Sequence, residues 1–192
     1  MLRRLECDDC NSLRIIPNFP SSLDTLILGF SQLSAIPELP VGLRYLELDF
    51  LQTLNQIPRI PDSCVKVLLR HNGPCGIQPP PCEIVDIINI PSLCKEFSAI
   101  HMGIKVFPQL PDSSTILESL NLNINTIESM PSLARFENLI SFGISANSLL
   151  KLDSLPNLLE HFDFSSNPII CVENKPPLVA DRLSEYIICP EN

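Results

Sequence analysis

Apolar residues recur along this chain with a period of about twenty positions. Counted from Leu23, aliphatic side chains fall at offsets 0, 3, 5, 10, 13 and 16, and prolines fall at offsets 14 and 17. The same template fits the stretches that begin at Cys94, Leu117 and Leu139. Because distant parts of the chain share one template, the chain consists of internal repeats, and each repeat is one structural unit.

Each repeat has two segments with different patterns. In the first, residues such as Tyr45-Leu46-Glu47-Leu48 alternate between polar and apolar, which predicts a short strand with one buried face. In the second, prolines such as Pro37 and Pro40 remove backbone donors and fix φ, which favours an extended or polyproline conformation over a helix. We therefore expect parallel strands stacked on one side of a coil and thin extended segments on the other.

The repeats extend over most of the 192 residues. We expect a single domain over 1–192 with about nine repeats and a partial one. Residues 64–93 are irregular, because a new repeat starts at Cys82, only 12 positions before Cys94. Residues 177–192 are a candidate C-terminal cap, formed either by a short amphipathic helix or by a last strand.

These residues resemble a leucine-rich-repeat protein, whose signature is L-x-x-L-x-L-x-x-N-x-L. The short units with prolines in their second half, such as Ile36-Pro37-Glu38-Leu39-Pro40, are similar to those of type-III-secreted bacterial effectors and of some large DNA virus proteins. The resemblance implies an α/β repeat solenoid, a horseshoe with a parallel β-sheet on its concave face and mostly extended convex segments. It also implies that asparagines at the ladder position satisfy backbone groups at the turn; these are Asn72, Asn125, Asn147 and Asn167.

The composition of the chain indicates which classes of partner it can bind and in which cellular compartment we expect it. The apolar fraction of 45% suffices for a core, and the formal charge of −9 is the wrong sign for binding nucleic acid. No apolar run is long enough to cross a bilayer, and Met1 is followed by no leader of signal-peptide type. We therefore expect a cytoplasmic protein, in the host cytoplasm if it is an effector or viral protein, with its eight cysteines reduced. A disulfide between Cys171 and Cys189 remains an alternative.

The sequence contains only weak candidates for a metal, redox or catalytic site. Cys7-Asp8-Asp9-Cys10 is a C-x-x-C motif, but no second pair stands at zinc spacing, so we interpret both cysteines as packing residues. His71, His101 and His161 fall at outward positions, with no nucleophile in a sharp turn nearby. The sequence predicts neither an enzyme nor a cofactor or metal site.

The outward residues of the strands are then the candidate functional surface, because solenoids bind partners along the concave sheet. The first six expected strands place apolar side chains outward beside acidic ones, and such patches mark protein contacts. The candidate partner-binding residues are Ile27, Phe30, Tyr45, Glu47, Asp49, Phe50, Leu68, Arg70, Ile84, Ile88 and Ile100. If the irregular stretch 64–93 shifts the register of the repeats, some of the apolar residues in this set are instead buried in the core.

These observations favour a non-enzymatic module that binds a partner protein on its concave face. A second interpretation is the substrate-recognition part of a ubiquitin ligase or other effector assembly whose catalytic part lies elsewhere. A third is a disulfide-capped extracellular receptor domain, which a count of free thiols would decide.

Overall fold

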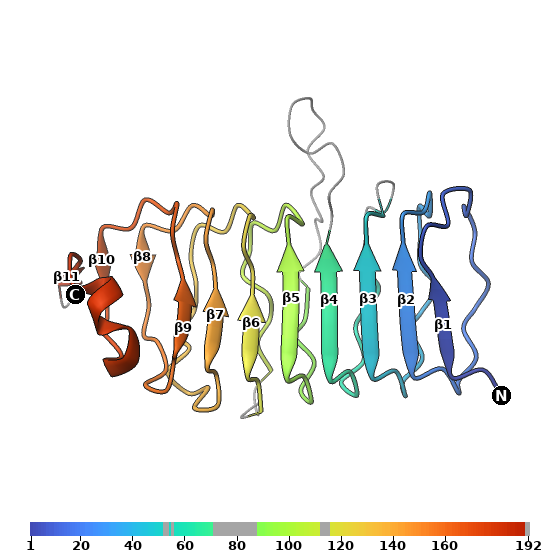
Figure 1. The fold of residues 1–192 in the computed structure, drawn as a ribbon, viewed down its shortest axis with the longest axis horizontal. Helices are drawn as coiled ribbons and strands as arrows, with labels where there is room; N and C mark the ends of the chain where they lie inside the picture. The colour runs from blue at the N-terminus through green and yellow to red at the C-terminus, as the bar shows by residue number, and fades with distance from the viewer. Residues whose placement is uncertain (52–53, 55, 71–87, 112–115, 191–192) are drawn as a thin grey trace.

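The computed structural model describes residues 1–51, 54, 56–70, 88–111 and 116–190. Eight parallel strands follow one another across a single sheet in the order β1-β2-β3-β4-β5-β6-β7-β9 (Figure 1). They are β1 (Arg4–Cys7), β2 (Thr25–Gly29), β3 (Tyr45–Asp49), β4 (Lys66–Arg70), β5 (Glu96–Ile100), β6 (Ser119–Asn121), β7 (Ser141–Gly143) and β9 (His161–Asp163). The predicted solenoid with a parallel sheet is confirmed.

Alternation within each strand separates core from surface. In β3, Leu46 and Leu48 are buried while Tyr45, Glu47 and Asp49 are half-buried on the other face. The inward positions of successive strands form one continuous core of aliphatic side chains, with Phe97, Phe142 and Phe162 in the later repeats. Each strand thus buries one face against its neighbours along the stack, as a solenoid requires.

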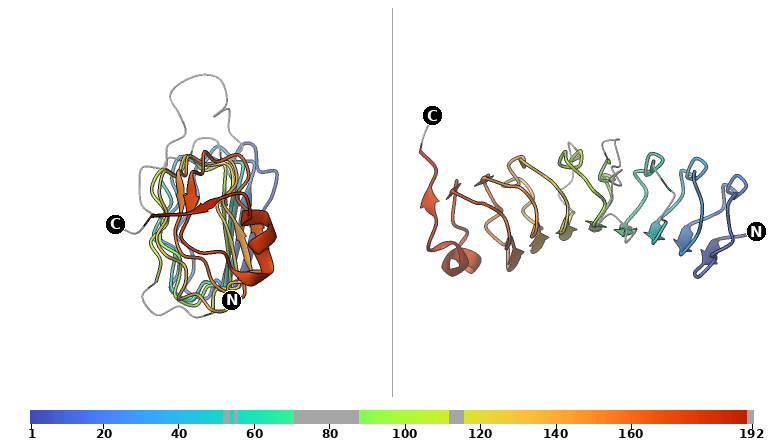
Figure 2. Two further views of the ribbon diagram at one scale, coloured as in Figure 1. Left: turned by 90° about the vertical axis from the view of Figure 1, so that its left-hand side faces the viewer. Right: turned by 90° about the horizontal axis from the view of Figure 1, so that it is seen from above.

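The side of the coil opposite the sheet is built of turns and extended segments (Figure 2). Within the described ranges, the 3₁₀ helix η1 (Pro177–Leu183) is the only helix. Three two-residue strands form a second parallel sheet in the order β11-β10-β8: β8 (Lys151–Leu152), β10 (Cys171–Val172) and β11 (Ile187–Ile188). The proline-rich second segments are therefore extended, as predicted.

Buried asparagines connect each later repeat to the one before it. Asn125 Oδ1 accepts hydrogen bonds from the backbone N–H groups of Met102 and Ile104 at 2.9 and 3.1 Å, and its Nδ2 donates to the Ala99 carbonyl at 2.8 Å. Asn147 and Asn167 make equivalent bonds one and two repeats later. The ladder role implied for these three asparagines is confirmed, while Asn72 lies outside the described residues.

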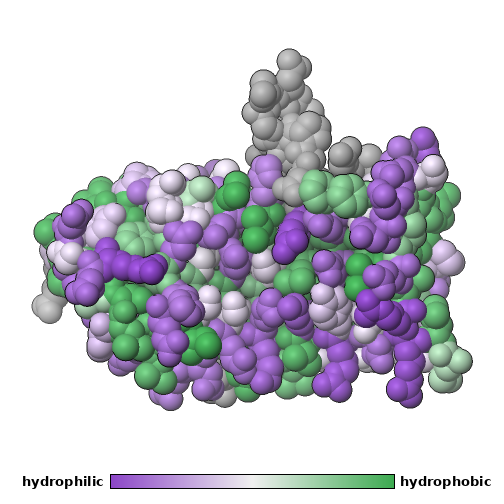
Figure 3. Space-filling view, viewed as in Figure 1, coloured by the Kyte–Doolittle hydropathy of each residue, from purple (hydrophilic) through white to green (hydrophobic). Residues whose placement is uncertain are grey.

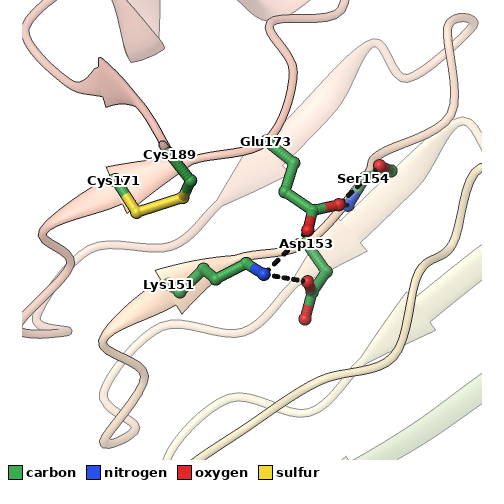
Figure 4. The surroundings of a disulfide bond; sticks show 6 residues. All are labelled: Lys151, Asp153, Ser154, Cys171, Glu173 and Cys189. Carbon is green, nitrogen blue, oxygen red and sulfur yellow. Dashed lines mark hydrogen bonds and ion pairs between the residues drawn. A yellow bond between two sulfur atoms is a disulfide. The ribbon is translucent and has the colours of Figure 1, made fainter. Parts of the chain in front are cut away.

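The C-terminal end contains both a helix and a strand, so both alternatives for 177–192 occur. Val179 and Leu183 of η1 are buried against the last coil, and Arg182 Nη1 donates to the Phe162 carbonyl at 2.6 Å. A disulfide joins Cys171 of β10 to Cys189, with the Cα atoms 5.0 Å apart (Figure 4).

An ion-pair cluster lies beside this disulfide (Figure 4). Lys151 Nζ contacts Asp153 Oδ1 at 2.9 Å and Glu173 Oε1 at 2.7 Å. The hydrogen bond from Lys151, with further bonds from Ser154 and Asp153, lowers the pKa of Glu173 to about 2. Glu173 therefore stays ionised and links the segments around β8 and β10 at ordinary pH.

Candidate protein-binding face

The outward side chains of the main sheet form straight rows, because the strands pair in register. Across β2, β3 and β4, Ile27 pairs with Glu47 and Glu47 with Leu68. Two residues further along the same strands, Gly29 pairs with Asp49 and Asp49 with Arg70. The structure thus brings together candidate residues that lie about twenty positions apart in the sequence.

Apolar side chains occupy part of this surface. Ile27, Leu68 and Ile100 are half-buried on β2, β4 and β5, each beside polar neighbours in its row. Figure 3, which faces the sheet, shows green hydrophobic groups interspersed among purple hydrophilic ones. The patch is therefore discontinuous, and a partner must satisfy polar groups as well as cover apolar ones.

Phe30 and Phe50 form a stacked pair immediately beyond β2 and β3. Their ring centroids are 4.3 Å apart with an interplanar angle of 12°. Both residues have a positive φ, 43° and 50°, and the corresponding residues of most other described repeats share this conformation. A bulky side chain rarely adopts positive φ, and here the turn after each strand imposes it and sets the two rings side by side.

Acidic groups border the aromatic pair. Tyr45 donates a 2.6 Å hydrogen bond to Glu47 Oε2, and burial together with this bond raises the pKa of Tyr45 to about 12. Burial also raises the pKa of Asp49, Arg70 opposes the shift, and Glu47 and Asp8 add to it. Asp49 Oδ1 is buried and has no hydrogen-bond partner among the described residues. The negative charge around Asp49 is thus only partly compensated.

Basic groups on the same face are largely paired with acidic neighbours. Arg4 contacts Glu6 at 2.7 Å, and Lys66 of β4 contacts Glu96 of β5 at 2.7 Å. Arg70 is exposed and forms no ion pair within the described part of the chain. The pairs hold side chains in place across the strands, and each adds little stability because both partners are solvated.

Two of the predicted site residues do not belong to the described face. Ile88 was expected to point outward, but it is buried in the core with 6% of its surface exposed, so that prediction is wrong. The reason is the short spacing before Cys94: β4 pairs directly with β5, so the described residues 88–93 do not form a strand of the main sheet between them. Ile84 lies outside the described residues.

The interpretation of Cys7 and Cys10 as packing thiols is also wrong, because they form a disulfide with Cα atoms 5.8 Å apart. With Cys171–Cys189, four of the six cysteines in the described ranges are oxidised, which overturns the expectation of eight reduced thiols. Cys64 and Cys94 are free and buried, and burial raises the pKa of each thiol to about 12. These two thiols are core residues, as expected from their leading position in a repeat.

The sequence analysis did not predict that another side chain packs against Gly29. A Cβ at Gly29 would lie 2.5 Å from Asp8 Oδ1, so the Asp8 carboxylate occupies the space that a side chain would fill. The signal was present in the register, because glycine stands at an outward position between Asp8 and Asp49. A glycine at such a position marks a close approach of another group to the backbone.

The later strands carry a different, polar surface. A shallow hollow over β6, β7 and β9 is lined by small and polar residues, among them Asn121, Asn123 and Gly143. Asn121 and Asn123 use their side-chain oxygens to accept the backbone N–H groups of Asn123 and Ser145. Phe142 and Phe162 are buried beneath the hollow, so it offers no aromatic platform.

In the described ranges, no group of three or more His, Cys, Asp or Glu residues has a geometry suited to a metal ion. No described helix has the length and apolar character needed to cross a bilayer.

Comparisons with known proteins find similarity among solved structures. No family model and no curated protein matches the chain. Among solved structures, YopM from Yersinia enterocolitica is similar with a TM-score of 0.65 and 22% identity, over 86% of this chain and 38% of YopM. The leucine-rich effector YopM from Yersinia pestis has a TM-score of 0.42 and 19% identity, over 88% of this chain and 62% of that one.

At this level of identity the first match shows the fold alone. The chain has the leucine-rich-repeat fold, in a form that resembles a bacterial effector, and it spans less than half the length of the Yersinia enterocolitica protein. What YopM does is therefore no evidence of what this chain does.

Proposed function

We propose that this protein is a non-enzymatic binding module that docks one partner protein on the outward face of β2 to β5. The observation that carries the proposal is the in-register surface where Ile27 and Leu68 flank Glu47, with the Phe30–Phe50 pair beside it. Apolar and aromatic groups supply contact area, and the acidic groups select a partner of complementary charge.

A protein partner fits this face better than other ligands do. The surface extends over four strands and places apolar and charged side chains next to one another, as protein interfaces do. The overall charge of −9 opposes nucleic acid and favours a partner with a basic contact surface. We propose a cytoplasmic location only for a form whose cysteines are reduced, since disulfides persist in oxidising compartments.

The test is capture of partners by the intact chain, followed by measurement of affinity for each recovered protein. The test variant replaces Ile27 and Leu68 by Glu. The matched control replaces Val41 and Val106 by Glu; both are well exposed outside the strands, at 86% and 58%. Circular dichroism and urea unfolding establish that both double variants remain folded.

The proposal is supported if a partner binds the wild type and the control with the same affinity and binds the Ile27/Leu68 variant at least about tenfold more weakly. The reason is that a charge buried at an interface costs several kcal/mol. Equal affinity for all three proteins places the contact elsewhere and contradicts it. Recovery of ubiquitin-ligase subunits in the wild-type sample favours the alternative in which this chain is the recognition part of a ligase.

A further inference from the structure

The two edges of the main sheet differ in how the chain covers them. At the β9 edge, the His161 N–H donates to the Ile140 carbonyl, so the backbone groups of the next residue, Phe162, point away from the sheet. Arg182 of η1 donates to this Phe162 carbonyl at 2.6 Å and so pairs the edge from within the chain. At the opposite edge, β2 is the one described strand that pairs with β1 (Figure 1). In the described chain, the β1 edge is therefore open to a further strand.

The open edge presents the backbone groups of two residues. The Arg3 carbonyl accepts the Thr25 N–H at 3.1 Å, so the backbone groups of Arg3 point toward β2. Those of successive strand residues point to opposite sides, so Leu5 also faces β2, while Arg4 and Glu6 face the open edge. Their N–H and carbonyl groups form a short template for pairing with another chain.

The apolar interior is also incompletely covered at this end of the stack. Leu5 of β1 is half-buried, whereas its partner Leu26 on β2 is fully buried. Ile15 has 83% of its surface exposed. Further apolar side chains of the first coil are only partly buried: Leu13, Ile16 and Phe19. A solenoid needs such an end covered, because each coil buries its face only against a neighbour.

The side chains of β1 indicate which strand fits this edge. Arg4 and Glu6 lie on the outward face with 57% and 51% of their side chains exposed, and Leu5 lies between them on the inward face. Charged residues on an edge strand normally keep other chains away. Here, however, the two charges are opposite. If two β1 strands pair antiparallel about Leu5, each Arg4 lies opposite the Glu6 of the other copy, and such cross-strand pairs are favourable.

The same register satisfies the open backbone groups. At alternate positions of an antiparallel pair, two opposite residues exchange both of their hydrogen bonds. Arg4 opposite Glu6 is such a position, because both residues face the open edge, so the pairing forms two bonds on each side of the centre. The two Leu5 residues then form the close pair without hydrogen bonds, with their side chains together on the inward face. A shift by one residue would set outward Arg4 against inward Cys7, which the alternation of faces forbids.

We propose that two copies of this chain join at their N-terminal ends, by antiparallel pairing of β1 with β1 about a two-fold axis between the two Leu5 residues. The interface is self-complementary, as a two-fold dimer requires. It makes one continuous sheet from two, and the partly buried apolar residues of the two first coils face one another. The contact leaves the outward face of β2 to β5 free, so it is independent of the proposed function.

The test is sedimentation of the intact chain over a range of concentrations, where we expect a reversible species of twice the mass of one chain. Arg4→Glu sets like charges opposite one another on both sides of the axis, so the dissociation constant of the dimer should rise at least about tenfold. Glu6→Arg should have the same effect. Arg4→Glu combined with Glu6→Arg restores both cross-strand pairs and should return the dissociation constant to within about threefold of wild type.

A matched control separates this contact from the overall charge of the chain. Lys105→Glu makes the same change of charge at an exposed ion pair with Glu128, away from β1, and should leave the dimer unaffected. Urea unfolding establishes that every variant is folded. Hydrogen exchange gives a second measurement: the amides of Arg4 and Glu6 should be protected in the wild-type dimer and lose that protection on dilution, because only the second copy pairs them.

Several results would overturn the β1 dimer. One is a chain that stays monomeric up to about 1 mM. Another is a dimer that both single substitutions leave intact or that the double substitution does not restore. Protection of the Arg4 and Glu6 amides that does not depend on concentration also contradicts it, and so do species larger than a dimer, which indicate a head-to-tail contact. None of these results changes the expected effect of Ile27→Glu and Leu68→Glu on partner capture, so the proposed function is tested separately.

Discussion

The side chain of Asn147 donates a hydrogen bond to the backbone carbonyl of Leu122, 25 residues earlier, at 3.0 Å. The same amide donates to Ile144 at 3.0 Å and accepts from the Ile127 N–H at 2.9 Å, so one buried side chain joins two repeats. Strands as short as β6 and β7 make few ladder bonds of their own. The asparagines therefore supply polar contacts that the short strands cannot.

Replacing Asn147 by alanine should destabilise the fold. The change leaves the Ile127 N–H buried without a partner, which costs about 1–3 kcal/mol. The Leu122 and Ile144 carbonyls each lose one donor and keep the other, from Asn125 and Asn167 respectively. We expect a loss of about 2 kcal/mol in urea unfolding monitored by circular dichroism. Asn11→Ala is the control: Asn11 is exposed and bonds only locally to Asp9, so its effect should stay within about 0.5 kcal/mol. Equal effects of the two changes would contradict the ladder role.

Two glycines should respond oppositely to alanine. A Cβ at Gly143 would lie 2.9 Å from Asn123 Oδ1 and 3.1 Å from Asn121 Oδ1, both held by backbone N–H groups. Gly143→Ala should therefore cost about 1–3 kcal/mol. At Gly42 the nearest atom lies 3.9 Å away, so Gly42→Ala should be neutral or stabilising by up to about 1 kcal/mol. Thermal unfolding of both variants checks this, and a neutral Gly143→Ala would show that the two asparagines move freely.

Tyr45 should ionise at high pH in the folded protein. Its pKa is raised to about 12 from the ordinary value near 10, because burial and the bond to Glu47 both favour the neutral phenol. The associated stability is present below pH 10 and is lost as the pH rises from 10 to about 12. Absorbance at 295 nm in a Tyr186→Phe background follows Tyr45 alone.

Removing the acceptor provides the control for this titration. Glu47→Gln deletes a charge and weakens the hydrogen bond, so the midpoint of Tyr45 should move down toward 10. An unchanged midpoint in the Glu47 variant, or a wild-type midpoint near 10, would show that the pair is broken in solution.

Periodicity predicts those features that every repeat shares. Leu26, Leu46 and Leu120 are fully buried, as their place in the template requires, because alternation in a strand has only two faces. The positions of Asn125 and Asn147 follow from the same register, and their ladder role was implied by the resemblance to leucine-rich repeats. Periodicity failed at Ile88, where a template applied across a 12-residue spacing assumed a strand that the pairing of β4 with β5 excludes.

The candidate binding face depends on contacts between side chains of neighbouring repeats, which the pattern of a single repeat does not show. The rows of outward residues follow from the register, so Glu47, Asp49 and Leu68 were placed correctly. The stacking of Phe30 on Phe50 depends on the positive φ of both residues, and neither is a residue type that signals such a turn. The Cys7–Cys10 bond was missed because the cysteines occupy positions that elsewhere in the template hold packing residues.

The redox state of the cysteines is the prediction with the widest consequences. In protein prepared without reductant, mass spectrometry after alkylation under denaturing conditions should find Cys7, Cys10, Cys171 and Cys189 unlabelled and Cys64 and Cys94 labelled. Without denaturant, Cys64 and Cys94 should react very slowly, because burial excludes the reagent and raises their pKa to about 12.

Opening the 18-residue loop closed by Cys171 and Cys189 should also reduce stability. Cys171→Ser with Cys189→Ser should cost about 3 kcal/mol in urea unfolding, the value expected for a loop of this length. Wild type in reductant should lose at least as much, because reductant also opens Cys7–Cys10. If all eight cysteines are labelled after denaturation, the extracellular interpretation is excluded and the cytoplasmic one retained.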